Sequence, residues 1–232
     1  MIRLVYLIIS LNTVLSEINR ANALIVGASQ GIGLGFVQAL LKRDNFTQVY
    51  ATYRNATTAG KLLELAAKYS DRLTCLQVDI TEEAQIATAA KQIKESVKHL
   101  HLAIYCVGVL HEGDLTPEKS LRQITADNLI YSFQVNSVGA VLLAKHLMPL
   151  FNKSDYPKGT LRERSIFASI SAKVGSIGDN RLGGWYGYRA SKAALNMFLK
   201  TTAIEYSRRC PQTIVVALHP GTTDTRLSQP FQ

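Results

Sequence analysis

The sequence predicts an α/β fold of one domain, in which a doubly wound parallel sheet carries helices on both faces. Three observations lead to this prediction. Apolar, strand-like runs alternate with segments of helical periodicity, as in parallel sheets covered on both sides. A glycine-rich stretch, residues 27–33, follows the first apolar run, where a strand would turn into a helix. The length of 232 residues is enough for one such domain with a sizeable core.

In the first half of the chain, three strands alternate with three helices. The strands are predicted from apolar runs at 23–26, 48–53 and 73–78. The first helix, 32–41, opens at the glycine-rich stretch. Two amphipathic helices follow: 61–68, with Leu62, Leu65 and Ala66 at core spacing, and 82–97, with Ile86, Ala89, Ala90 and Ile93 on one face.

The second half continues the alternation. It reads as strand 102–106, a segment 121–147 that forms one long helix or two, strand 165–170, helix 188–207 and strand 213–217. Since no repeat or linker interrupts the pattern, residues 21–232 are expected to form one domain. A domain of this type normally continues with a further helix and strand, so either the C-terminus is truncated or the fold ends early.

Residues 1–20 precede the first predicted strand as an extension to which the sequence assigns no role. The apolar run 4–9 follows Arg3 and faintly resembles a secretory signal. It is too short to span a bilayer as a helix. Cleavage near residues 21–23 would also cut into the first strand. We therefore favour a helical extension or a start codon assigned too early, and expect no membrane contact.

The charge pattern argues against a nucleic-acid-binding protein, and the cysteine spacing argues against a metal site. The net charge is +9, yet no dense Lys/Arg run or interleaving of basic and aromatic residues indicates nucleic-acid binding. Cys75, Cys106 and Cys210 are far apart and have no nearby partners of metal-ligand type. They are predicted to be buried thiols of a cytoplasmic protein, with no metal site.

The glycine-rich stretch has the pattern of a phosphate cradle. Glycine allows a tight turn and lets phosphate oxygens approach the backbone N–H groups at a helix N-terminus. The stretch therefore predicts the pyrophosphate site of a dinucleotide, with Ser29 and Gln30 able to contact phosphate or ribose. Its candidate residues are Gly27, Ser29, Gln30, Gly31, Ile32 and Gly33.

The second and third strands end in further candidates for the cofactor. A site that prefers NAD usually carries an acidic residue after the second strand, where this chain has Arg54. An arginine there suits a 2′-phosphate and favours NADP(H) over NAD(H), although a solvated arginine is the alternative. Asp79 and Ile80 end the third strand, where they are placed to contact adenine. Asp79 is equally suited to the start of the following helix.

A tyrosine and a lysine supply the candidate chemistry. Tyr188 and Lys192 lie four residues apart on one helix face, so the ammonium is expected to lower the pKa of the phenol. Ser171 and Ser169, at the end of strand 165–170, could hydrogen-bond a substrate carbonyl. Asn136 is a poor helix former within a helical segment, where it could kink the helix and hold a water for proton relay. A plain surface polar residue is the competing interpretation.

Two loops complete the candidate site. Pro220 and Gly221 form a turn after the last strand, and Thr222 and Thr225 could contact the nicotinamide amide or the pyrophosphate. Substrate would lie among the residues around 108–116 and 175–187. Leu182, Trp185 and Tyr186 in the second loop suggest an apolar or aromatic substrate, or are packing residues.

Taken in order, these motifs resemble those of the short-chain dehydrogenase/reductase family over nearly the whole chain. They are Gly27-x-x-x-Gly31-Ile32-Gly33, Asp79, Gly108, Asn136, Tyr188-x-x-x-Lys192 and Pro220-Gly221-x-x-x-Thr225. Within the family, the stretches 174–177 and 183–192 are similar to the branch of C-factor and sniffer-type carbonyl reductases. The resemblance implies a Rossmann-type fold, NADP(H), an Asn-Ser-Tyr-Lys tetrad, and a homodimer or homotetramer.

The chain departs from the family pattern at three places, of which the short C-terminus leaves the lid over the substrate undefined. The Asn-Asn-Ala-Gly stretch of the family is here Tyr105-Cys106-Val107-Gly108, so the asparagine hydrogen bonds that steady the fourth strand are missing. By its spacing to Gly175, the family's catalytic serine falls on Ala172, which leaves Ser171 as candidate and Ser169 as fallback.

Together the motifs predict an NADPH-dependent oxidoreductase. It would transfer hydride to the carbonyl of a small-molecule substrate, with Tyr188 as proton donor and Lys192 and Asn136 as the relay. The alternative is a non-catalytic NADP-binding signalling protein on the same fold, which the displaced serine favours.

Overall fold

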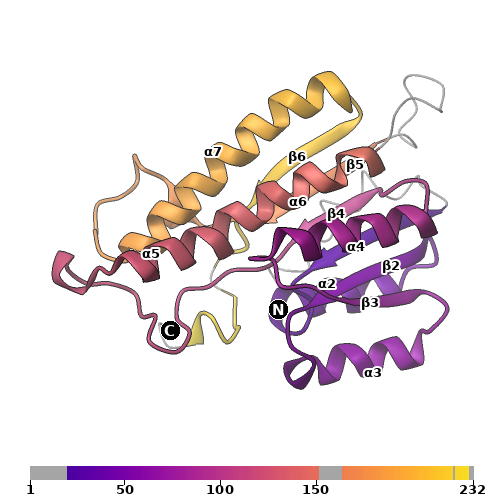
Figure 1. The fold of residues 1–232 in the computed structure, drawn as a ribbon, viewed down its shortest axis with the longest axis horizontal. Coiled ribbons are helices and arrows are strands. Elements are labelled where there is room, and N and C mark those ends of the chain that lie inside the picture. The colour runs from indigo at the N-terminus through magenta and orange to yellow at the C-terminus, as the bar shows by residue number, and fades with distance from the viewer. Residues whose placement is uncertain (1–19, 152–163, 222, 230–232) are drawn as a thin grey trace.

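A computed structural model describes residues 20–151, 164–221 and 223–229 (Figure 1). Its six strands form one parallel sheet in the order β3-β2-β1-β4-β5-β6. The order reverses between β1 and β4, as in a doubly wound sheet, and this confirms the predicted fold class. The strands are β1 (Ala21–Val26), β2 (Phe46–Tyr53), β3 (Leu73–Gln77), β4 (Leu102–Tyr105), β5 (Ser165–Ile170) and β6 (Thr213–Leu218).

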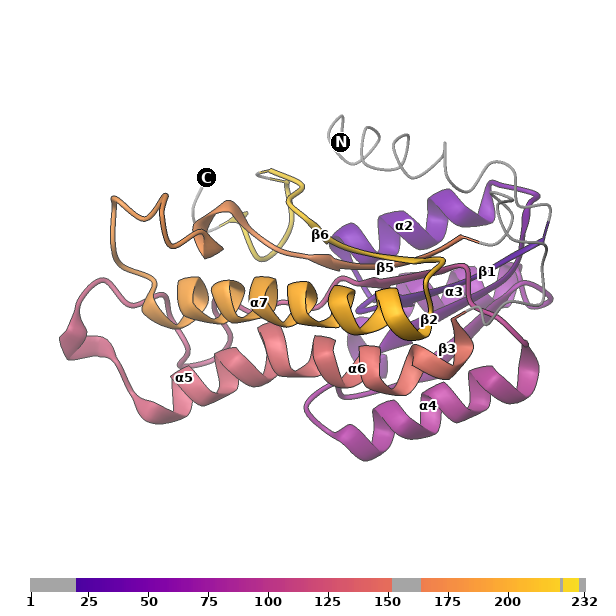
Figure 2. The same ribbon diagram turned by 90° about the horizontal axis from the view of Figure 1, so that it is seen from above.

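Helices cover both faces of the sheet, with α4 to α7 on one side and α2 on the other (Figure 2). They are α2 (Gly31–Leu41), α3 (Gly60–Lys68), α4 (Glu83–Ser96), α5 (Ala126–Phe133), α6 (Gly139–Leu147) and α7 (Tyr186–Arg209). Alternate residues of one strand serve two cores. Leu24 and Val26 pack with α4, α6 and α7, whereas Ala23 and Ile25 pack with α2 and α3.

The segment predicted as one long helix or two is interrupted by a π-helical turn, Gln134–Val138, between α5 and α6. The helix passes very close to the sheet at this point. A Cβ added at Gly139 would lie 2.7 Å from the Tyr105 hydroxyl and 2.9 Å from a side-chain carbon of Ile80. Single π-helical turns within α-helices are often found at functional sites.

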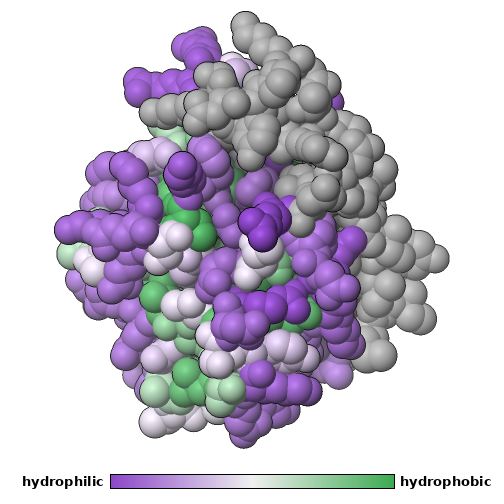
Figure 3. Space-filling model, turned by 90° about the vertical axis from the view of Figure 1, so that its right-hand side faces the viewer, coloured by the Kyte–Doolittle hydropathy of each residue, from purple (hydrophilic) through white to green (hydrophobic). Residues whose placement is uncertain are grey.

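Hydrophilic residues cover most of the described surface on the face shown in Figure 3. In the described ranges, no helix has the length and apolar character needed to cross a membrane. The same ranges contain no group of three or more His, Cys, Asp or Glu side chains that could hold a metal ion. Cys210 is buried, whereas Cys75 and Cys106 are only partly buried, and all three are free thiols.

Candidate active site

One cavity of about 1050 Å³ lies at the carboxyl ends of the strands. Ligands bind at this edge in open parallel sheets. Most of the residues predicted for the site line this cavity. These are Gly27, Ser29, Gln30, Gly31, Ile32, Gly33, Arg54, Asp79, Ile80, Gly108, Ser171, Tyr188, Lys192, Pro220, Gly221 and Thr225. Thr222 lies outside the described residues, and Asn136 lies behind the wall.

The glycine-rich turn is shaped as a cradle for an anion. Gly27 and Gly31 have φ values of +80° and +55°, which side-chain-bearing residues rarely adopt. A Cβ added at Gly33 would lie 2.2 Å from the carbonyl oxygen of Gly27. The residue before α2, Gln30, makes no side-chain cap hydrogen bond, and the first turn of α2 holds no acidic residue. The helix N-terminus therefore offers its N–H groups to the cavity, which fits a dinucleotide pyrophosphate.

The adenosine end of the predicted cofactor site is formed where β2 and β3 end. Arg54 lines the cavity there, and its guanidinium pairs with Glu112 and donates to the Tyr131 hydroxyl at 3.0 Å. Asp79 also lines the cavity. One of its carboxylate oxygens accepts hydrogen bonds from the Thr81 backbone N–H (2.9 Å) and hydroxyl (2.7 Å). Asp79 thus lines the cavity and closes a turn before α4, whereas the N-cap residue of α4 is Glu82, which makes no side-chain cap hydrogen bond.

Tyr188 and Lys192 project from α7 into the cavity. The Lys192 ammonium is almost fully buried, donates to the Ile170 carbonyl at 2.9 Å and lies 5.8 Å from the centre of the Tyr188 ring. Burial lowers the pKa of Lys192 to about 8, against an opposing effect of Cys106. Burial also raises the pKa of Tyr188 to about 12, opposite to the predicted direction, because the cost of desolvating phenolate outweighs any help from the ammonium.

Asn136 holds the π-turn to two neighbouring segments. Its side-chain oxygen accepts from the Val109 backbone N–H (2.7 Å), and its amide donates to the Val109 carbonyl (2.9 Å) and the Ser191 hydroxyl (3.0 Å). The side chain is fully buried, so the interpretation as a surface residue is wrong. The expected helix irregularity is confirmed at this residue. The relay through a water stays a prediction.

The positions of the Ser171 and Ser169 hydroxyls distinguish the two candidates for the catalytic serine. Ser171 and Ala172 line the cavity, whereas Ser169 is fully buried and is absent from the described lining. The Ser171 hydroxyl donates to the Asn196 side-chain oxygen at 2.7 Å. Ser171 is therefore better placed than Ser169 to meet a substrate, provided that its hydroxyl turns away from Asn196.

The start of α7 depends on a residue that the sequence analysis missed. Glu118 is buried; both its carboxylate oxygens accept from the Gly187 N–H (3.3 and 3.2 Å), and its carbonyl accepts from the Trp185 N–H at 2.5 Å. Trp185 has a φ of +53° and packs edge-on against the Tyr188 ring, 6.3 Å between centroids. Glu118 thus anchors the helix end that carries Tyr188, but it lies 69 residues from Gly187, so no local pattern could reveal it.

Only part of the predicted substrate wall faces the cavity. Trp185 lines it, but Leu182 is 93% exposed and Tyr186 is 37% exposed, and neither belongs to the described lining. Apolar lining also comes from Leu110, in the predicted loop 108–116, and from Leu227, which the sequence did not single out. Both lie in loops without helical or strand periodicity.

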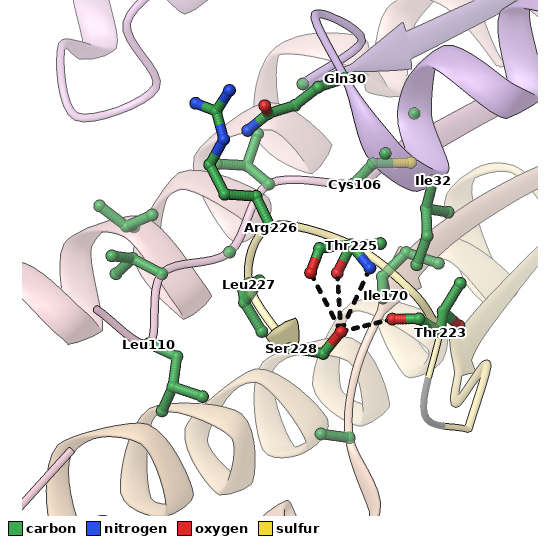
Figure 4. Close-up of a pocket in the computed structure, with 18 of the residues that line it drawn as sticks. Gln30, Ile32, Cys106, Leu110, Ile170, Thr223, Thr225, Arg226, Leu227 and Ser228 are labelled. Carbon is green, nitrogen blue, oxygen red and sulfur yellow. Dashed lines mark hydrogen bonds between the residues drawn. The ribbon is translucent and has the colours of Figure 1, made fainter. Parts of the chain in front are cut away.

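The C-terminal segment folds across the cavity (Figure 4). The Ser228 hydroxyl holds it together by donating to the carbonyl of Thr223 (2.5 Å) and accepting from the N–H of Thr225 (3.2 Å). The Leu227 carbonyl lies 3.3 Å from a ring nitrogen of His111. Arg226 was not predicted; it lines the cavity and reaches toward Gln30 in Figure 4, where its charge suits an anion.

A glycine-rich turn, a strand-end arginine and a buried tyrosine–lysine pair lie around one cavity, the arrangement expected of a nicotinamide-dependent oxidoreductase. Residues 21–232 match the family model described as short chain dehydrogenase, and the chain belongs to this family. It is therefore a dehydrogenase or reductase built on a Rossmann-type sheet.

Similar proteins agree with this assignment. The chain is 34% identical over 203 residues to the short-chain dehydrogenase RED3 of Pyricularia oryzae, covering 85% of this chain and 74% of the relative. It is 31% identical to the (S)-benzoin-forming benzil reductase IRC24 of Saccharomyces cerevisiae, covering 89% and 73%. An NADPH-bound carbonyl reductase from chicken fatty liver superposes with a TM-score of 0.76 at 29% identity (92% and 84% covered). Sniffer, a carbonyl reductase of D. melanogaster, superposes with a TM-score of 0.76 at 27% identity, covering 90% of this chain and 83% of Sniffer.

Proposed function

We propose that the protein is an NADPH-dependent carbonyl reductase in which Tyr188 is the proton donor. The observation that carries this proposal is the placement of Tyr188 and Lys192 in the same cavity as the glycine-rich turn. When bound, the cofactor supplies a hydride to the carbonyl carbon. The carbonyl oxygen takes a proton from Tyr188, and the product is an alcohol.

The residues around Tyr188 support this role. With its pKa raised by burial, Tyr188 stays protonated at neutral pH and is ready to donate. The resulting phenolate would be stabilised by the Lys192 ammonium, whose pKa of about 8 keeps most molecules charged at pH 7. Ser171 would hold the carbonyl oxygen. Asn136 would hold the turn of α7 next to Lys192 in place through its hydrogen bond to Ser191. It would also take part in the proton relay.

The preference for NADP(H) over NAD(H) is proposed from the end of β2. Arg54 stands there in place of the acidic residue that binds the ribose 2′-hydroxyl of NAD. A guanidinium is the side chain best matched to a 2′-phosphate. The carbonyl reductase from chicken fatty liver was solved with NADPH bound, which supports the same preference in a similar protein.

The substrate is proposed to be a carbonyl compound with apolar or aromatic groups. Trp185, Leu110 and Leu227 line the cavity and would contact such groups. One relative is named a benzil reductase, which is consistent with an aromatic ketone. A cytoplasmic location and assembly into a homodimer or homotetramer remain predictions.

The test is titration with NADPH and NADH, followed by energy transfer from Trp185, the chain's single tryptophan. Tyr188→Phe is titrated beside the wild type, and consumption of NADPH is followed with a panel of aromatic and aliphatic ketones. We expect similar NADPH binding by both proteins and turnover by the wild type only. Turnover by Tyr188→Phe at the wild-type rate would refute the role of Tyr188.

A second candidate is a non-catalytic NADP-binding signalling protein. The observation that favours it is Ala172 on the cavity wall, where the resemblance places a catalytic serine. Tight NADPH binding without turnover of any ketone, in wild type and in Ala172→Ser alike, would support this candidate over the reductase.

A further inference from the structure

The arginine expected to take the 2′-phosphate already has an anionic partner inside the protein. One Arg54 nitrogen donates to a Glu112 carboxylate oxygen, and another donates to the Tyr131 hydroxyl at 3.0 Å. The Tyr131 hydroxyl donates to the second Glu112 oxygen at 2.5 Å. All three side chains line the cavity, so this closed triangle of hydrogen bonds lies within the cofactor site.

Glu112 is held in place independently of Arg54. Its backbone N–H donates to the Leu115 carbonyl (3.1 Å) and its carbonyl accepts from the Leu115 N–H (3.0 Å), which closes a tight turn. Gly113, with a φ of +57°, allows this turn, and Leu115 is buried in the core. The backbone of Glu112 therefore stays beside the cavity when Arg54 engages another anion, and the Tyr131 hydroxyl still donates to the carboxylate.

The charges at this end of the cavity oppose one another. The Arg54 guanidinium lowers the pKa of the Glu112 carboxyl, and burial, Tyr131 and nearby Asp79 have smaller effects of either sign. Glu112 is thus ionised at neutral pH. A 2′-phosphate arriving at Arg54 would meet a guanidinium engaged by one carboxylate, with a second carboxylate, Asp79, on the same cavity wall.

We propose that Glu112 is a specificity-determining residue for the cofactor, whose carboxylate competes with the 2′-phosphate of NADPH for Arg54. The competition weakens the preference for NADPH over NADH, because the ribose of NADH presents only hydroxyls at this position. Glu112 then sets how strongly Arg54 discriminates, and Tyr131 strengthens its hold on Arg54. This inference rests on the proposed use of a nicotinamide cofactor with Arg54 at its 2′-position.

The experiment measures cofactor affinity in the full chain without any turnover. NADPH and NADH are titrated into wild type and Glu112→Gln, followed by energy transfer from Trp185. We expect the dissociation constant for NADPH to fall about 3- to 10-fold, as for loss of one competing ion pair at a half-exposed site. The constant for NADH should change less than about twofold. The gain for NADPH should shrink in high salt, which screens the charges.

A matched control removes the same charge from the same loop. Asp114 is exposed and lies outside the described lining of the cavity, so Asp114→Asn should leave both affinities unchanged. Tyr131→Phe should tighten NADPH binding less than Glu112→Gln does, since the carboxylate stays. In the Arg54→Gln background there is no guanidinium to compete for, so Glu112→Gln should increase the affinity for NADPH much less.

Two results would overturn the inference. One is an unchanged ratio of the NADPH and NADH constants in Glu112→Gln. The other is weaker NADPH binding in that variant, which would mean that Glu112 orients Arg54 for the phosphate instead of competing with it. Failure of the proposed function looks different, because a wild-type protein that binds neither cofactor fails before any variant is compared.

Discussion

The clearest prediction concerns Gly33, at the start of α2. Its backbone has an ordinary negative φ, so alanine would bring no dihedral strain there. An added Cβ, however, would lie 2.2 Å from the Gly27 carbonyl oxygen and 2.9 Å from its carbonyl carbon. Both atoms are backbone, so no side chain can rotate away. The strand-to-helix turn must open by about 1 Å to restore ordinary contact distances.

The expected cost follows from this displacement. Overpacking of this kind costs about 1–3 kcal/mol, which lowers the Tm of a domain of this size by about 3–10 °C. The same movement shifts the N–H groups at the start of α2, so NADPH affinity should fall about 10-fold or more. Urea unfolding and NADPH titration of Gly33→Ala measure the two effects.

Gly60 provides the matched control. It begins α3, and an added Cβ would meet no atom within 4 Å. Gly60→Ala should therefore unfold at the wild-type urea concentration, or slightly above it because alanine restricts the unfolded chain, and bind NADPH normally. If Gly33→Ala matched Gly60→Ala in both assays, the argument from close approach would be refuted.

Three further predictions concern single residues: Tyr105, His101 and Ala172. Tyr105→Phe should lose about 1–3 kcal/mol in urea unfolding, because the buried Val135 carbonyl loses its 2.6 Å hydrogen bond. Burial lowers the pKa of His101 to about 4 from 6.5, so the unfolded chain binds a proton between these values that the folded chain does not. The free energy of unfolding should fall as the pH is lowered from about 6.5 to about 4, by up to about 1.4 kcal/mol per pH unit, and His101→Gln should flatten this slope when unfolding is measured at each pH. Ala172→Ser should raise ketone turnover about 2- to 10-fold by adding a hydrogen bond at the cavity wall; unchanged kcat/KM would contradict this.

Hydrophobic periodicity predicted the fold because buried parallel strands and amphipathic helices leave strong local patterns. The strand at 165–170 coincides with β5, and the helix expected at 188–207 begins at Tyr186 and ends at Arg209. Helix ends were less predictable. α7 starts where Trp185 is held in a left-handed conformation by a bond to the distant Glu118, a cause that periodicity does not register.

The site was predictable where its residues follow a strand end within one or two positions, as at Arg54, Asp79 and Ser171, because parallel strands bring their carboxyl ends to one edge. What these residues contact was less predictable. The pairing of Arg54 with Glu112 joins positions 58 residues apart. The direction in which the Tyr188 pKa shifts depends on its burial by several segments, whereas spacing along the helix predicts only that Lys192 lies nearby.

The departure from the family pattern at Tyr105-Cys106-Val107-Gly108 has a structural counterpart. The asparagines expected to steady β4 are absent, yet the strand is tied to the π-turn from two sides. Tyr105 donates to the Val135 carbonyl (2.6 Å), and Asn136 bonds both backbone groups of Val109. These bonds hold the loop from which Glu112 reaches Arg54 and Glu118 reaches the start of α7. Because one loop contacts both ends of the cavity, movement of this loop would change cofactor selection and the position of Tyr188 together.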